Sequence, residues 1–199
     1  KLALKGALLS PDFLFRIENE PAGDGIQPIT DHELAARLSY FLWSTMPDEE
    51  LRGLADRGGL NRPEILTAQI DRMLQDPRAH VFAKTFMGQW LGTKDVGGRV
   101  APTQNSIQHY YTPEVAADMR REVVLMFQHL LRENRSILEL IDADYIFLTR
   151  RLAKFYQLDR EEELPRSGFR KLALKDKRRG GLLGAGAVLA LTSHFKKTS

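Results

Sequence analysis

The side chains of this chain that are best suited to hold a metal or a haem are histidines. There are five of them, His32, His80, His109, His129 and His194. None stands in a His-x-x-x-His or Glu-x-x-His arrangement, the spacings that place ligands on one helix face in zinc proteases and di-iron bundles. Glu122 and His129 are seven residues apart, so they can share a polar stripe with Glu133. That stripe is either a metal site or, by default, a solvated helix face.

Two of the histidines occur in contexts that fit a functional role. His109 directly precedes Tyr110 in the long irregular stretch from Thr93 to Tyr111, and loops of that length inside a domain are usually functional or mobile. His109 and Tyr110 are therefore candidate catalytic residues, and the alternative is that they attach the loop to the core. His194 follows a glycine-rich segment near the end of the chain and is a candidate cofactor-binding residue. No metal site is predicted.

Paired acids and clustered glycines suggest two further chemistries. Asp142 and Asp144 could serve acid–base catalysis or bind calcium, but no EF-hand ligand series follows them. The favoured interpretation is that Asp144 caps a helix beginning at Tyr145. The segment Arg179–Gly184 lacks the Gly-Lys-Ser/Thr ending of a phosphate loop. Its glycines are instead expected to let two helices approach closely, or to let the chain turn sharply into a helix.

The composition excludes several classes of site and partner. The 199 residues include no cysteine, which excludes disulfides, zinc-thiolate sites, iron–sulfur ligation and covalent c-type haem attachment within this chain. No apolar run approaches the ~18–20 residues that span a bilayer. Seven basic residues lie between Arg166 and Arg179, but they are not interleaved with aromatic residues as in single-stranded nucleic-acid sites. Neither nucleic acid nor a membrane span is predicted, and no cofactor is expected within this chain.

The hydrophobic pattern predicts an all-α fold, an irregular helical bundle of about seven to nine helices with at most a minor β hairpin. The longest helix is expected from Thr112 to about Asn134, with its apolar residues central in the core. Trp43 and Trp90 are predicted to be buried. Helices are also predicted over 1–9, from the capping box at 30–33, from Pro47, from Asn61, after Pro77, over 145–158 and over 180–193, and a short strand over 169–174.

Three segments of the sequence carry a resemblance to a known family. They are Ser10–Glu18, Leu38–Ser44 closed by Pro47–Leu51, and Arg179–Gly184 running on to Ser193. Together they resemble a domain of unknown function found in large, exported proteins that contain cytochrome c, best known from planctomycetes. The resemblance covers nearly the whole chain and implies a helical domain over 1–178, with 179–199 forming a glycine-rich helix and the start of a following haem-bearing module.

The resemblance implies a function only in outline. It implies a helical scaffold or interaction domain, itself non-catalytic, within a larger electron-transfer protein. The c-type haem would lie in the adjoining module. That cytochrome-c-like module or a redox partner would be the partner of this domain, and the protein would be exported to the periplasm or the cell surface. The alternative is an enzyme domain acting on a large substrate such as a polysaccharide, with its site in the 93–111 loop. The resemblance implies no catalytic residues.

Overall fold

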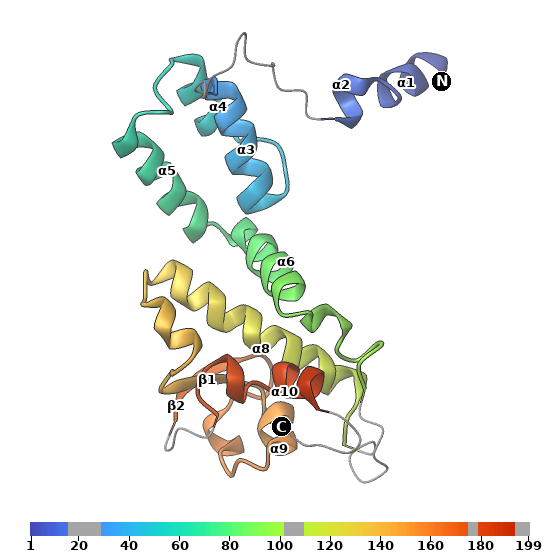
Figure 1. Ribbon diagram of the computed structural model, residues 1–199, viewed down its shortest axis with the longest axis vertical. Helices are drawn as coiled ribbons and strands as arrows, with labels where there is room; N and C mark the ends of the chain where they lie inside the picture. Colours follow the sequence, from blue (N-terminus) through green and yellow to red (C-terminus); the bar gives the residue numbers. More distant parts are fainter. Residues whose placement is uncertain (16–28, 102–109, 175–178, 194–199) are drawn as a thin grey trace. The chain divides into compact units, whose positions relative to one another are not determined.

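The computed structural model of the protein describes residues 1–15, 29–101, 110–174 and 179–193. These residues are mainly helical, with one two-stranded antiparallel sheet (Figure 1). The prediction of an all-α fold with a minor β hairpin is therefore confirmed. The chain divides into two compact units, one formed by residues 1–41 and 45–69 and the other by residues 42–44 and 70–199. Within the described ranges, no helix has both the length and the apolar character needed to cross a membrane.

The helices of the first unit begin where the sequence places capping residues. The Thr30 hydroxyl accepts a hydrogen bond from the Glu33 N–H at 3.2 Å, and the Glu33 carboxylate accepts one from the Thr30 N–H at 2.8 Å, which confirms the predicted capping box. Asp48 caps the next helix by accepting from the Leu51 N–H at 3.0 Å. The helices that contribute residues to this unit are α1 (Leu2–Leu8), α2 (Pro11–Leu14), α3 (Asp31–Trp43), α4 (Glu49–Asp56) and α5 (Pro63–Gln75).

The second unit is built around α8 (Pro113–Arg132), its longest described helix. Thr112 caps this helix through the Val115 N–H, as the sequence predicts. The helix packs against α6 (His80–Trp90), α9 (Arg150–Phe155) and α10 (Gly186–Thr192), and against the sheet (Figure 1). Its apolar side chains are buried, among them Met119, Val123, Phe127 and Leu130. Short 3₁₀ turns complete the unit, at Pro77–Ala79 (η1), Thr93–Asp95 (η2), Ile137–Leu140 (η3), Glu161–Glu163 (η4) and Leu182–Gly184 (η5).

The helix predicted over 145–158 is wrong in its first part. Residues Tyr145–Leu148 form strand β1, which pairs antiparallel with β2 (Arg170–Ala173) so that Tyr145 lies opposite Ala173. Asp144 is not a helix cap, because its carbonyl accepts a hydrogen bond from the Leu174 N–H at 2.7 Å at the end of the sheet. The segment Tyr-Ile-Phe-Leu is aromatic and β-branched, a composition that favours a half-buried strand once a partner strand is available.

The single helix predicted over 180–193 is also wrong. The backbone of Gly181 has φ 70° and ψ −174°, a conformation open almost only to glycine, so the chain turns sharply there. The 3₁₀ turn η5 follows, and α10 begins only at Gly186. A Cβ on Gly181 would lie 2.8 Å from the Leu140 carbonyl oxygen. The glycines therefore let the backbone turn against the 140–143 segment, and they do not serve packing between two helices.

The two tryptophans have opposite environments. Trp43 is 2% exposed, its indole N–H donates to the Met73 carbonyl at 3.0 Å, and the Arg78 guanidinium lies 3.4 Å from the ring centroid. Its predicted burial is confirmed. Trp90 is 57% exposed, so the prediction for it is wrong. The buried residues of α6 are Ala83 and Met87. Trp90 is the last residue of the helix, and its ring stacks on Phe86 at the surface.

Candidate functional site

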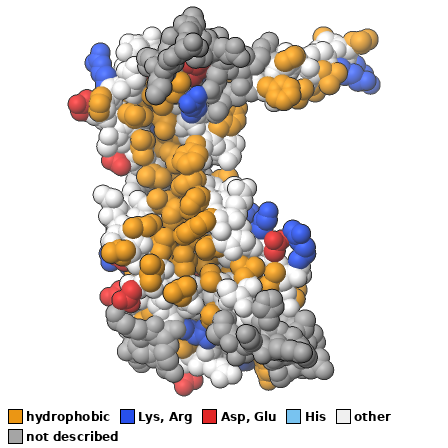
Figure 2. Space-filling view, viewed as in Figure 1, with side chains coloured by type: hydrophobic (Ala, Val, Ile, Leu, Met, Phe, Trp, Pro, Cys, Tyr) orange, Lys and Arg blue, Asp and Glu red, His pale blue; other side chains and the backbone are white. Residues whose placement is uncertain are grey.

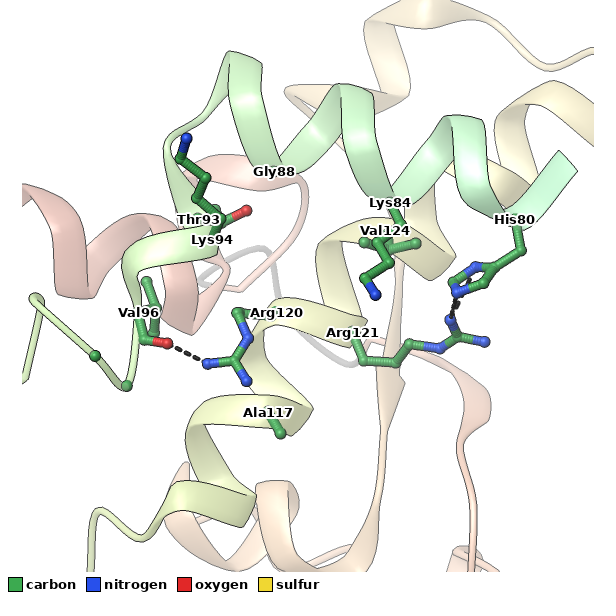
Figure 3. Close-up of a pocket in the computed structure, with 12 residues that line it drawn as sticks. His80, Lys84, Gly88, Thr93, Lys94, Val96, Ala117, Arg120, Arg121 and Val124 are labelled. Atoms are coloured by element: carbon green, nitrogen blue, oxygen red, sulfur yellow. Dashed lines mark hydrogen bonds between the residues drawn. The ribbon is translucent and has the colours of Figure 1, made fainter. Parts of the chain in front are cut away.

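A pocket of about 600 Å³ opens in the second unit between α6, α8 and the loop that begins at η2 (Figure 3). Its size lies within the range of small-molecule sites. Many of its lining side chains carry positive charge or hydrogen-bond donors. The lining consists of His80, Lys84, Gly88, Thr93, Lys94, Val96, Gly97, Gly98, Ala117, Arg120, Arg121 and Val124.

Helix α6 contributes one side of the pocket through residues four apart. His80, Lys84 and Gly88 occupy successive turns of one helix face, and Gly88 adds no side chain to fill the space. The helix is positioned by the turn before it, where Asp76 accepts a hydrogen bond from the Arg78 N–H at 2.8 Å and pairs with the Arg78 guanidinium at 2.7 Å. The Asp76–Pro77 break predicted from the sequence thus sets where α6, and this side of the pocket, begins.

Helix α8 contributes the opposite side through two adjacent arginines. One guanidinium nitrogen of Arg121 lies 2.6 Å from Nε2 and 2.9 Å from Nδ1 of His80 (Figure 3). Burial, and then the charge of Arg121, lower the pKa of His80. The imidazole is therefore neutral at pH 7 and can accept a hydrogen bond from the guanidinium. This contact orients Arg121 without neutralising its charge.

The loop after η2 holds the second arginine in place. The Arg120 guanidinium donates to the Val96 carbonyl (Figure 3). The next residue, Gly97, has φ 84°, and a Cβ there would lie 2.6 Å from the Ala116 Cβ and 2.9 Å from an Arg120 nitrogen. Gly97 is therefore required both for the backbone conformation and for the space that Arg120 occupies.

The lining is rich in groups that can bind an anion. Among the described residues that line the pocket there is no Asp, Glu or Cys, and the one hydroxyl, that of Thr93, is directed to the Met87 carbonyl. His80 is the lining side chain of the type most often used in general acid–base catalysis. Guanidinium and ammonium groups instead provide charge-assisted donors for an anion.

A separate buried cluster surrounds Glu122 on α8. Its carboxyl accepts a hydrogen bond from the Tyr156 hydroxyl at 2.6 Å, and that hydroxyl accepts one from the Gly186 N–H at 2.9 Å. The Arg179 guanidinium lies 4.1 Å from the centre of the Tyr156 ring. Burial raises the pKa of Glu122 to about 7 and raises the pKa of Tyr156 above its ordinary value. The cluster joins α8, α9 and α10, so its contacts are those of a structural link.

The pH dependence of stability is expected to report on Glu122. Its pKa is raised from the ordinary 4.5 to about 7, so the stability it confers is fully present below pH 4.5 and is lost as pH rises through about 7. Glu122→Gln imitates the protonated carboxyl. Relative to this variant, the wild type should lose on the order of 3 kcal/mol of unfolding free energy between pH 4.5 and pH 8. Urea denaturation of both proteins across this range measures the difference. An unchanged difference would show that Glu122 is already ionised at low pH.

Only some of the residues that the sequence singled out belong to the described part of the chain. His109 and His194 lie outside the described residues. Tyr110 is described and is 69% exposed in a turn before α8; its catalytic role stays a prediction. The proposed stripe on α8 is divided, because Glu122 bonds Tyr156 while the His129 ring contacts the Lys171 ammonium at 2.8 Å. Across the described ranges, no three His, Cys, Asp or Glu side chains converge in a way that could hold a metal ion.

The sequence did not predict the pocket residues of α6 and α8, but it did single out the loop that supplies part of the lining. Thr93, Lys94 and residues 96–98 line the pocket, and they belong to the long loop in which the enzyme alternative placed its site. The available signals were the adjacent pair Arg120–Arg121 and the helical spacing of His80 and Lys84. Neither is specific, because charged residues at such spacings usually form solvated helix faces.

Comparison with known proteins identifies the family of this chain. No curated protein and no solved structure matches it. Residues 29–158, well over half of the chain, match the family described as PSD4, protein of unknown function (DUF1592). The matched region spans α3 to α9. It includes every lining residue of the pocket between α6 and α8, which we call the basic pocket. The chain therefore belongs to the DUF1592 family.

Proposed function

We propose that this chain is a non-catalytic helical interaction domain of a larger exported protein that also carries a c-type cytochrome module. The observation that carries the proposal is an apolar surface on α6, formed by Phe82, Phe86 and Trp90, which we call the aromatic face. Hydrophobic side chains gather over this helix on the molecular surface (Figure 2). Contiguous exposed apolar surface is typical of sites that another protein surface covers.

The aromatic face is pre-ordered. The Phe86 ring stacks on Trp90 with centroids 5.6 Å apart and on the buried Phe127 at 5.2 Å, and Phe82 lies 5.7 Å from Phe86. Phe86 and Trp90 nevertheless remain 40% and 57% exposed. Rigid aromatic side chains lose little entropy on binding and are frequent anchors of protein interfaces. This combination of order and exposure favours a role in docking.

The occupant that fits this surface is the adjoining cytochrome-c-like module. Helix α10 packs against η2, the turn that directly follows α6, so the chain leaves α10 in the same part of the unit as the aromatic face. A module that continues from Ser193 would be tethered there, and a short tether gives a high effective concentration for docking. The family resemblance of the segment Arg179–Ser193 supports a haem-bearing module at this position, in a periplasmic or cell-surface electron-transfer protein.

The experiment uses the full-length protein, expressed in a host that matures c-type cytochromes. We expect the absorption bands and haem stain of covalently bound haem. The double variant Phe86→Ala/Trp90→Ala should keep the domain folded, because both side chains are partly exposed and neither belongs to the buried core. It should release the module, so that limited proteolysis after Ser193 becomes at least tenfold faster. Tyr40→Ala, which removes an exposed aromatic residue in the first unit, is the matched control. A protein without haem, or equal cleavage rates in all three proteins, would refute the proposal.

An enzyme acting on a large substrate such as a polysaccharide is the second candidate. One observation favours it, namely that the 93–98 part of the loop lines the pocket. The donors in that pocket could bind an acidic substrate, but the lining offers no carboxylate pair of the kind that cleaves glycosidic bonds. Release of reducing ends from acidic polysaccharides, abolished by Arg121→Gln, would establish this alternative.

A further inference from the structure

The basic pocket between α6 and α8 gathers positive charge from two helices. Several arginines in the second unit have a carboxylate partner. Arg151 pairs with Asp118 at 2.9 Å, Arg135 with Glu139 at 2.8 Å and Arg160 with Glu163 at 2.7 Å. The partners of Arg120 and Arg121 among the described residues are instead neutral, the Val96 carbonyl and the His80 ring. The charge of these two arginines is therefore held in place without being neutralised.

A third cation points into the same space. Lys84, one turn after His80, extends between the two guanidinium groups, whereas Lys94 points away from them (Figure 3). Like charges gathered beside a low-dielectric wall repel one another, and an anion bound among them relieves that repulsion. Within the described ranges, no carboxylate bonds Lys84, Arg120 or Arg121.

The geometry of the donors indicates which anion fits. A carboxylate has two oxygens and is satisfied by one bidentate arginine. Two guanidiniums and an ammonium that approach from two helices match a group with more oxygens and more charge. Gly88 and Gly97 keep the surrounding space open, and the volume of about 600 Å³ leaves room for a molecule attached to the anionic group. We propose that this pocket binds a tetrahedral oxyanion, a phosphate or sulfate group, carried by a small molecule or a glycan.

The inference is independent of docking at the aromatic face, since it concerns another side of α6 and a different class of partner. Titration of the 199-residue chain with inorganic phosphate and with sulfate, at constant ionic strength, tests it. Each anion should raise the Tm saturably by about 3 °C or more. Glucose 6-phosphate and glucose 6-sulfate then distinguish a phosphoester from a sulfated sugar, because the true ligand class should bind more tightly than its free anion.

Substitutions locate the effect. Arg121→Gln and Lys84→Gln should each weaken anion binding at least tenfold in isothermal titration. Lys84 is exposed, so its replacement leaves the fold intact even if Arg121→Gln does not. Lys154→Gln removes an exposed lysine on α9, outside the pocket, and should bind as the wild type does. The inference is overturned if neither anion binds saturably, if sodium chloride produces the same shift, or if Lys154→Gln weakens binding as much as Lys84→Gln.

Discussion

Phe127→Ala is expected to lower the free energy of unfolding by about 3–5 kcal/mol. The side chain is 6% exposed on the central helix α8, and its ring contacts those of Phe82 and Phe86 at 5.9 and 5.2 Å. Truncation removes the apolar area that the ring buries and leaves a cavity between α6 and α8, which the surrounding helices can only partly close. Chemical denaturation followed by circular dichroism measures the loss.

The matched control for Phe127 is Phe86→Ala. Phe86 belongs to the same aromatic stack but is 40% exposed, so its removal should cost well under half as much. The comparison separates burial against α8 from aromatic stacking alone. A loss below about 1 kcal/mol for Phe127→Ala, or equal losses for the two variants, would contradict the central position of this residue.

Gly181→Ala is expected to cost about 3–5 kcal/mol, from two causes that add. The backbone conformation at φ 70° and ψ −174° is strained for any residue with a side chain, at about 1–3 kcal/mol. The added methyl group would also lie 2.6 Å from the Ile141 carbonyl carbon and 2.8 Å from the Leu140 carbonyl oxygen. Overpacking against backbone adds about 1–3 kcal/mol. The difference in unfolding free energy between variant and wild type measures the total.

Gly168→Ala separates the two causes. Gly168 also has a positive φ, 83°, but a Cβ there would meet no atom within 4 Å. Its replacement should cost only the backbone strain, about 1–2 kcal/mol. If Gly181→Ala were no worse than Gly168→Ala, the close approach of the 179–184 segment to residues 140–143 would be wrong.

Local sequence signals located most helices of this protein correctly. Thr30 with Glu33, Asp76 with Pro77, and Thr112 with Pro113 each mark a helix boundary through hydrogen bonds between neighbours in the chain. The interactions that set these boundaries span no more than four residues, so the local sequence is enough to predict them. The hydrophobic period of 112–134 likewise predicted the central helix and its buried face, because one long amphipathic helix has one apolar side.

The errors arose where distant segments meet. Tyr145–Leu148 has an apolar pattern compatible with either a helix or a strand, and pairing with residues 170–173 decides for the strand. Trp90 continues the apolar pattern of α6, but it lies at the very end of the helix and is 57% exposed. The chain turns at Gly181, where the backbone of residues 140–141 lies against it. At the strand and at Gly181 the deciding contacts lie more than 20 residues away in the chain, beyond the reach of local patterns.

The absence of cysteine, the absence of paired histidine ligands and the helical class followed from the sequence alone, because each depends on residue types and short spacings. The basic pocket did not. His80 and Lys84 come from α6, the two arginines from α8, and the Val96 carbonyl that accepts from Arg120 from the loop. Each of these sets alone is typical of an ordinary solvated surface. Only the packing of α6 on α8 brings these charges together, with no carboxylate among the described lining residues, because side-chain convergence is a property of tertiary structure and not of any single helix.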